Sequence, residues 1–327
     1  MRTIVPGVRT LVLISSLLLL TTRSSSQSIT TGNGKVELGL GIGPMFFLGD
    51  LGGNSGIGKS TWLKDVQFPL TKLSKGIYLN IYPAEWIGFR LAINQGSLEG
   101  YDSATKDKGG EEVFRKMRNL QFRSSLLEGY AALEIAPTVF LEKYDGLFGK
   151  LRPYGLIGIG VFHFNPKGKY YAPDGTSKWV ALQPLHLEGQ GFPEYPDRKP
   201  YSLTQMEIPM GFGFKYYVKE NFYVGFEILH RQTFTDYMDD VSKTYIDNSL
   251  FAKYLTPEQA AMANQLYYRQ DFVPYTTQTR TPTDPQRGDA TQNDAFFSSI
   301  IRLGWRLNDR NSADGRALRQ LRCPAFY

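Results

Sequence analysis

Eight segments of the chain alternate apolar residues with small, polar or charged residues at a period of two. Successive side chains of an extended strand point to opposite faces, so each segment gathers its apolar groups on one face. In the first segment Leu38, Leu40 and Ile42 alternate with glycines, which predicts a strand with one apolar face. The segments cover residues 36–42, 77–81, 87–93, 127–135, 157–161, 206–216, 222–228 and 297–307.

The fourth of these strands begins before its regular pattern does. Leu120, Phe122 and Leu126 are apolar but have the opposite parity from the residues that follow. Because a β-bulge shifts the parity of a strand by one residue, the sequence predicts a bulge near Ser124 or Ser125.

The connections distinguish a membrane barrel from a soluble sandwich or a soluble barrel. Short turns at one end, long loops at the other and both termini at the short-turn end are typical of outer-membrane proteins. The predicted fold is therefore an all-β, eight-stranded antiparallel transmembrane β-barrel of OmpA or OmpX size, placed in the cell outer membrane. The turns are 82–86, 219–221 and the moderate 137–150, and the long outer loops are 51–73, 98–118, 165–202 and 236–294.

Aromatic residues lie near both ends of the predicted strands. Amphipathic rings prefer the level of the lipid headgroups, so two aromatic belts are expected around the barrel. The expected belts are Tyr82, Trp86, Tyr216, Tyr217, Phe222 and Trp305 at the short-turn end, and Phe46, Phe47, Phe164, Phe234 and Phe296 at the long-loop end.

The N-terminus resembles a secretory signal. A basic start, an apolar run at Leu11–Leu20 and a small polar stretch ending near Ser26 predict a signal peptide over residues 1–27. Residues 28–307 then form the barrel, and 308–327 a periplasmic tail. Three arginines of the signal account for half of the formal net charge of +6, and the remaining charge is too weak for a nucleic-acid partner.

The face opposite the apolar one carries acids and bases in equal number. If the apolar face contacts lipid, these side chains point into a lumen just wide enough for side chains to fill. The sequence therefore predicts a paired plug and not a pore. The predicted lumen network is Glu37, Glu128, Glu134, Glu207 and Glu227 with Arg90, Lys215, Arg231, Arg302 and Arg306.

Several apparent motifs for chemistry lack their usual context. Residues 53–60 match a phosphate-binding loop, but no apolar strand ending in Asp completes a nucleotide site, so a Gly-rich outer loop is expected. His163, His186 and His230 have no close spacing, which argues against zinc. Nothing in the sequence resembles a nucleophile elbow, so the chain is predicted not to be an enzyme. No cofactor site and no defined metal site are predicted.

Two features of the last outer loop stand out. Asp236, Asp239 and Asp240 could hold calcium or magnesium, or could form a solvated or Arg-paired cluster, and their spacing matches no defined calcium loop. Further on, the capping pattern at residues 256–259 predicts a short helix from Thr256 to about Arg269, packed over the barrel mouth.

Short motifs spread over the predicted mature chain resemble the PorG-like outer-membrane barrels of the Bacteroidota, also described as the DUF6089 type. His186-Leu187 departs from the Gly-Thr expected between two of these motifs. The motifs are Phe162–Lys167, Leu182–Leu185, Glu188–Gly191 and Phe234–Ser242, with Gly49–Leu51, Arg118–Leu120, Arg287–Asp289 and Cys323-Pro324.

The resemblance implies a non-catalytic component of the type IX secretion system, which exports cargo across the outer membrane and in many species supports gliding motility. Proteins of this family tie the membrane to a periplasmic ring of the lipoprotein PorK and its partner PorN. Some barrels of the family have no assigned role. An orphan barrel with adhesive or ligand-binding outer loops is therefore the alternative.

The periplasmic end is where the partner is expected. The only cysteine, Cys323, follows basic residues that favour its reactive thiolate, so an intermolecular disulfide with a ring subunit is predicted; a free thiol is the alternative. Aromatic residues of the moderate turn would supply the apolar part of the docking surface. The predicted contact residues are Phe140, Tyr144, Phe148, Arg319, Arg322 and Cys323.

Overall fold

The computed structural model describes residues 35–51, 71–84, 86–104, 112–140, 150–219, 221–269 and 286–307. Its elements include nine strands, most of them longer than the segments predicted from the sequence. In chain order they are β1 (Lys35–Leu48), β2 (Lys72–Ala84), β3 (Ile87–Tyr101), η3 (Asp102–Ala104), α2 (Glu112–Arg118), β4 (Gln121–Ile135), η4 (Pro137–Phe140), β5 (Leu151–Tyr171), β6 (Ser177–Ala181), η5 (Gln183–Leu185), β7 (Thr204–Lys219), β8 (Phe222–Thr233), α4 (Ser249–Tyr254), α5 (Pro257–Tyr267) and β9 (Ala295–Arg306).

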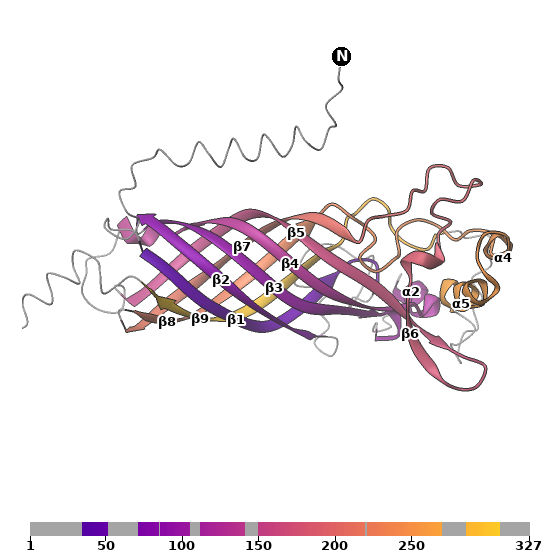
Figure 1. The fold of residues 1–327 in the computed structure, drawn as a ribbon, viewed down its shortest axis with the longest axis horizontal. Coiled ribbons are helices and arrows are strands. Elements are labelled where there is room, and N and C mark those ends of the chain that lie inside the picture. The colour runs from indigo at the N-terminus through magenta and orange to yellow at the C-terminus, as the bar shows by residue number, and fades with distance from the viewer. Residues whose placement is uncertain are drawn as a thin grey trace, which may run out of the picture.

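Eight of the strands close into an antiparallel barrel (Figure 1). The hydrogen-bonded order runs β4-β3-β2-β1-β9-β8-β7-β5, and pairing of β4 with β5 closes the ring. The strand β6 lies outside the ring, where it pairs with the outer extension of β5. The predicted eight-stranded fold is confirmed, and the predicted loop 165–202 contains this additional hairpin.

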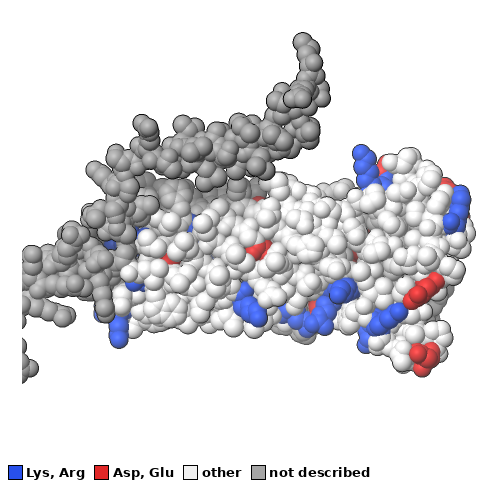
Figure 2. Space-filling view, viewed as in Figure 1, with Lys and Arg blue, Asp and Glu red and all other residues white. Residues whose placement is uncertain are grey.

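The outer wall of the barrel is apolar. Register places Leu79 beside Leu91, Leu91 beside Ala131, and Ala131 beside Ile159 on one wall. Leu91 is 55% exposed and Ile159 is 66% exposed, values that soluble proteins rarely show over a continuous surface. The wall visible in Figure 2 is largely free of charged side chains. Such a closed, apolar wall is the architecture of outer-membrane barrels.

Within the described residues, no helix has the length and apolar character needed to cross a membrane.

The bulge predicted near Ser124 or Ser125 is wrong. β4 pairs with β3 and with β5 in continuous register through both positions. Phe122, Ser124 and Leu126 all point inward and are almost completely buried. The parity of the strand therefore does not change; instead the lining of the lumen changes from charged to apolar towards the outer end.

The expected aromatic belts are only partly formed. Trp86, Tyr216 and Trp305 lie exposed on the outer wall, as a headgroup belt requires. Tyr82 points into the lumen and is buried. At the long-loop end, Phe164 and Phe296 belong to a buried cluster and do not face lipid. Parity, and not residue type, therefore decides which side of the wall each ring occupies.

The long loops build a cap over the outer mouth. α5 begins with the predicted capping box, in which Thr256 and Gln259 exchange hydrogen bonds, and α4 precedes it. Buried residues of the cap, among them Phe251 and Leu266, join Phe122 and Phe162 from the barrel wall in one apolar cluster. This cluster joins the outer end of the barrel to the cap, whose helices α4 and α5 lie beyond the long-loop end of the strands in Figure 1.

Candidate functional site

The lumen next to the short turns holds a first cluster of charges. Lys215 Nζ lies 2.6 Å from Glu134 Oε1 and 3.3 Å from Glu37 Oε2, and it also contacts the Tyr82 hydroxyl. Arg306 lies 3.5 Å from the other oxygen of Glu37. The adjoining cavity has a volume of about 10 Å³, which is about the room that one water molecule needs.

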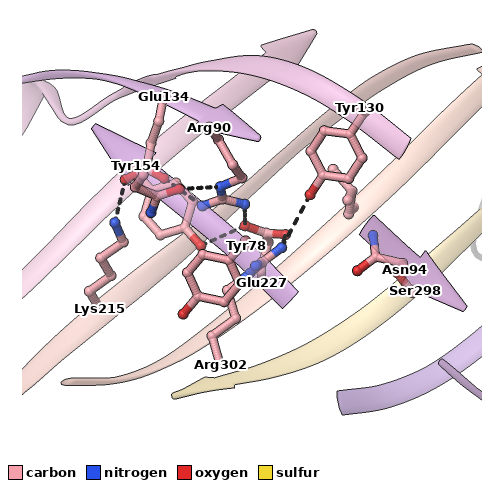
Figure 3. A network of polar contacts seen from close by, with 12 residues as sticks. Tyr78, Arg90, Asn94, Tyr130, Glu134, Tyr154, Lys215, Glu227, Ser298 and Arg302 are labelled. Atoms are coloured by element: carbon pink, nitrogen blue, oxygen red, sulfur yellow. Dashed lines mark hydrogen bonds and ion pairs between the residues drawn. The ribbon is translucent and has the colours of Figure 1, made fainter. Parts of the chain in front are cut away.

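A second cluster occupies the middle of the lumen (Figure 3). Arg90 donates to Glu227 through Nη1 and to Glu134 through Nη2, both at 2.5 Å. Arg302 donates to the second oxygen of Glu227, and the Tyr154 hydroxyl donates to the first at 2.7 Å. Because every charge is matched by an opposite charge within hydrogen-bond distance, the cluster is held in a single arrangement.

A third cluster lies nearer the outer mouth. Arg231 donates to Glu128 through both Nε and Nη2, at 3.0 and 2.5 Å, and its Nη1 donates to Leu229 O and Ser298 Oγ. Asn94 also donates to Glu128. Each nitrogen of this guanidinium therefore has an acceptor.

Glu207 departs from the predicted plug. Its side chain is 1% exposed, yet neither carboxylate oxygen has a hydrogen-bond partner in the described part of the chain. The expectation that every lumen acid is paired is therefore wrong at this position. The physical reason is that Arg231 donates its Nε and Nη2 hydrogen bonds to Glu128 and not to Glu207.

All ten predicted lumen residues thus lie inside the barrel, and nine of them form ion pairs. Sequence reasoning missed the tyrosines that fill the space between them. Rings of Tyr78 and Tyr154 lie 5.4 Å from the Arg90 guanidinium carbon, and Tyr78 and Tyr223 share a hydrogen bond of 3.0 Å. Their inward parity was the available signal.

Glycines of neighbouring strands make room for these rings. A Cβ atom added at Gly304 would lie 2.3 Å from the ring of Tyr223, and one at Gly88 would lie 2.4 Å from the ring of Tyr82. The glycines on the inward parity are therefore part of the plug. Buried side chains therefore occupy the lumen at the level of the three charged clusters.

A separate polar network holds the cap to the barrel rim. Arg118, at the end of α2, donates to both oxygens of Asp102 at 2.8 and 2.9 Å, and to the carbonyl groups of Asp50 and Arg287. Arg287 in turn lies 2.9 Å from Glu188. These residues come from loops that are far apart in the sequence, so the network ties the outer loops together.

Residues from several of the motifs quoted in the sequence analysis meet in this network. Glu188 accepts hydrogen bonds from the amides of Ser242 and Lys243 at 3.0 and 2.9 Å. Asp239 accepts one from the amide of Leu51 at 3.0 Å. Asp50 accepts one from the amide of Asp289 at 2.7 Å. Five of the motifs quoted above therefore build one structure at the outer mouth.

His186 occupies a backbone position that favours glycine. Its φ of 47° lies in the left-handed region, where an L side chain is disfavoured by roughly 1–2 kcal/mol. The glycine expected from the resemblance would fit here without that strain. His186 therefore holds this left-handed conformation at a cost in backbone strain.

Several carboxylates of this network are unusual because they are buried and lie near other acids. Burial raises the pKa of Asp50 to about 6, although Arg118 opposes the shift. It raises the pKa of Asp240 to about 7 and that of Asp236 to about 9. Burial raises the pKa of Asp294 well above its usual range as well, and the neighbouring aspartates add to this shift.

The predicted alternatives for Asp236, Asp239 and Asp240 can now be separated. The cluster is buried and not solvated, and Asp240 is held by the Tyr201 hydroxyl at 2.7 Å and by Arg287 at 3.9 Å. Among the residues that the structure describes, no group of three or more His, Cys, Asp or Glu is arranged to hold a metal ion.

Other predictions fall on residues outside the described ranges. These are the signal peptide at 1–27, the phosphate-loop match at 53–60 and the tail at 308–327 with Arg319, Arg322 and Cys323. Tyr144 and Phe148 of the moderate turn also lie outside. Of Phe140, only the backbone is described, at the end of η4.

No protein-family model and no curated protein matches this chain. Solved structures similar to it are outer-membrane proteins of low sequence identity. The attachment invasion locus protein Ail of Yersinia pestis, in complex with a heparin analogue, is 8% identical, with 85% of this chain and 99% of that chain covered and a TM-score of 0.33. OprG of Pseudomonas aeruginosa is 10% identical, with 86% and 99% covered and a TM-score of 0.36. A major outer-membrane protein of Thermus thermophilus is 10% identical, with 84% and 99% covered and a TM-score of 0.33.

Proposed function

We propose that the protein is a non-catalytic outer-membrane component of a type IX secretion system that organises a periplasmic ring of the PorK and PorN type. The proposal rests on the resemblance to PorG-like barrels. The observation that supports it best is the convergence of five separated motifs on the buried network around Arg118, Glu188 and Arg287. Residues shared for a common architecture are expected to meet in this way.

The filled lumen limits what such a component does. With Arg90, Arg302 and Glu227 almost completely buried between opposite charges, folded cargo has no path through this barrel. The role that fits is mechanical: the barrel fixes a position in the membrane, and its periplasmic side holds the ring.

The proposed contact surface lies at the short-turn end. It combines the aromatic residues of the moderate turn, Phe140, Tyr144 and Phe148, with Arg319, Arg322 and Cys323 of the tail. Apolar rings and a basic tail would suit a partner with an apolar patch edged by acids. A disulfide through Cys323 would make the contact permanent in the oxidising periplasm.

The test is affinity purification of the tagged full-length chain from outer membranes, with mass spectrometry of its partners. Proteins of the PorK and PorN type should co-purify with the tagged chain. They should no longer co-purify when residues 312–327 are removed. On a non-reducing gel, a band that collapses on reduction and is absent in Cys323→Ser would establish the disulfide. Normal cargo secretion by a strain without the gene would contradict the proposal.

An orphan barrel with adhesive outer loops is the second candidate. The observation that favours it is the hairpin of β5 and β6, which extends beyond the barrel rim and presents Tyr171, 39% exposed, beside Lys169. Exposed rings and basic groups are suited to binding glycans or anionic surfaces. Loss of surface attachment with normal secretion after deletion of residues 172–176 would select this function.

A further inference from the structure

Basic side chains gather on one part of the outer wall. Register places Glu99 beside Arg123 and Arg123 beside Lys167 on adjacent strands. Lys72 and Arg123 lie 3.0 and 3.3 Å from the same acid, Glu99. Lys75 is exposed on β2, and Lys169 follows Lys167 on the same face of β5. Two of these five bases, Lys72 and Arg123, therefore contact one acid, and the other three lie on the same wall.

This cluster occupies only one side of the barrel. Along the outer halves of β1, β7, β8 and β9, the outward-facing positions that the structure describes carry no Lys, Arg, Asp or Glu. The bases lie on β2, β4 and β5, and Figure 2 shows Lys and Arg side chains towards the loop end of the visible wall. A general attraction to the membrane surface would not require this asymmetry.

An apolar hollow lies on the same wall, below the bases. Gly129 and Ala131 form its low floor on β4, because large side chains project on either side. The neighbours across β3 and β5 include Ile93, 55% exposed, and Val161, 52% exposed. A Cβ atom at Gly129 would meet only Ala92 O, at 3.9 Å, so the space above this residue is open.

Along the membrane normal, the basic residues and the hollow are separated by about the thickness of the hydrocarbon layer of one leaflet. Arg123 and Gly129 are six residues apart on β4, which is about 20 Å along a strand and about 15 Å along the membrane normal at a tilt of about 40°. Half of the hydrocarbon core is also about 15 Å thick. An acyl chain whose headgroup sits at Arg123 therefore reaches the hollow.

We infer that this wall binds one phosphorylated lipid of the outer leaflet. Its phosphate accepts hydrogen bonds from Arg123 and the lysines around it, and an acyl chain lies in the hollow over Gly129 and Ala131. Arginine and lysine together match a phosphate, which carries up to two negative charges and several acceptor oxygens. The inference concerns a lipid contact in the membrane and is independent of the proposed secretion role.

The test is native mass spectrometry of the full-length chain, folded in neutral detergent and titrated with bisphosphorylated lipid A. The variant Lys75→Gln, Arg123→Gln, Lys167→Gln should bind about tenfold more weakly or worse, because each basic group near a headgroup contributes separately. The matched control Lys199→Gln, Lys243→Gln, Lys253→Gln removes three cap charges and should bind as the unchanged protein does. Heat-dependent gel mobility shows that each variant is folded.

Two further measurements distinguish the binding of a lipid from the binding of a simple ion. Gly129→Leu fills the hollow and should weaken lipid A binding at least threefold. Lipid A without its phosphates should bind the unchanged protein and the triple variant with equal affinity. Equal affinity of the triple variant and the unchanged protein would overturn the inference. Complete displacement of the lipid by millimolar inorganic phosphate would overturn it as well, because it would reveal an ion site without a chain contact.

Discussion

Arg90 on β3 and Glu227 on β8 meet at 2.5 Å in the centre of the lumen, and both side chains are completely buried. A buried ion pair of this kind adds little stability compared with apolar packing, but removing one partner leaves a charge without compensation. The lumen is therefore sensitive to the loss of any one of its paired charges, and these pairs give the strands a defined mutual position.

Glu227→Gln should destabilise the barrel by about 3–5 kcal/mol, because Arg90 and Arg302 would lose the acid that they share. Denaturant unfolding in detergent micelles measures the change. Glu258→Gln, at a cap residue whose side chain is 77% exposed, is the control and should change stability by less than about 0.5 kcal/mol. Equal unfolding curves for the two variants would contradict the paired lumen.

Glu128 and Glu207 offer a sharper comparison because they are the same residue type in the same part of the lumen. Glu128→Gln should cost about 3 kcal/mol, since Arg231 would be left without its acid. Glu207→Gln should be neutral or stabilising, because no base is paired with that carboxylate. Thermal unfolding at neutral pH compares them; a larger loss for Glu207→Gln would show that it is paired after all.

Gly304→Ala should destabilise the barrel by about 1–3 kcal/mol, because its new Cβ atom would lie 2.3 Å from the Tyr223 ring. Gly129→Ala, on the open outer wall, is the matched control and should have little effect. Combining Gly304→Ala with Tyr223→Leu should recover part of the loss. Without such recovery, the close approach of ring and glycine would not be the cause.

The outer cap should become less stable as pH rises. The folded pKa values of Asp50, Asp240 and Asp236 are raised to about 6, 7 and 9, whereas the unfolded value is about 3.9. Between pH 4 and 9 the folded state thus holds more protons than the unfolded state, so stability present at low pH is lost as pH increases.

Amide hydrogen exchange of residues 236–242, corrected for its intrinsic pH dependence, measures this change. Asp236→Asn should remove part of the pH dependence and slow exchange at pH 9 by at least about tenfold, the factor that a pKa raised by a single unit produces. Cap protection that increases from pH 6 to 9 in the unchanged protein would show that these carboxyls are not held protonated.

Parity along the strands is why so much of the fold could be predicted. A period of two assigns each residue to the lipid side or the lumen side, and in a narrow barrel that assignment is enough to bring Arg90 near Glu134 and Glu227. It does not assign partners. The preference of Arg231 for Glu128 over Glu207 depends on side-chain geometry across three strands.

The wrong bulge near Ser124 and the buried position of Phe164 share a physical cause. Both predictions assume a uniform barrel in which every apolar residue, including Leu120, Phe122 and Phe164, faces lipid. The cap formed by α4 and α5 makes the outer lumen apolar, so inward residues there are apolar too. Contacts of that kind link segments more than a hundred residues apart, and no local pattern reveals them.

Conductance in a planar lipid bilayer tests the central claim most directly, because a paired and filled lumen leaves no path for ions. The account predicts that the purified, folded chain shows no steady conductance at moderate voltage, and that Glu227→Gln with Arg302→Met does not create a selective pore. A stable, ion-selective current from the unchanged protein would contradict the closed lumen and, with it, a purely structural role.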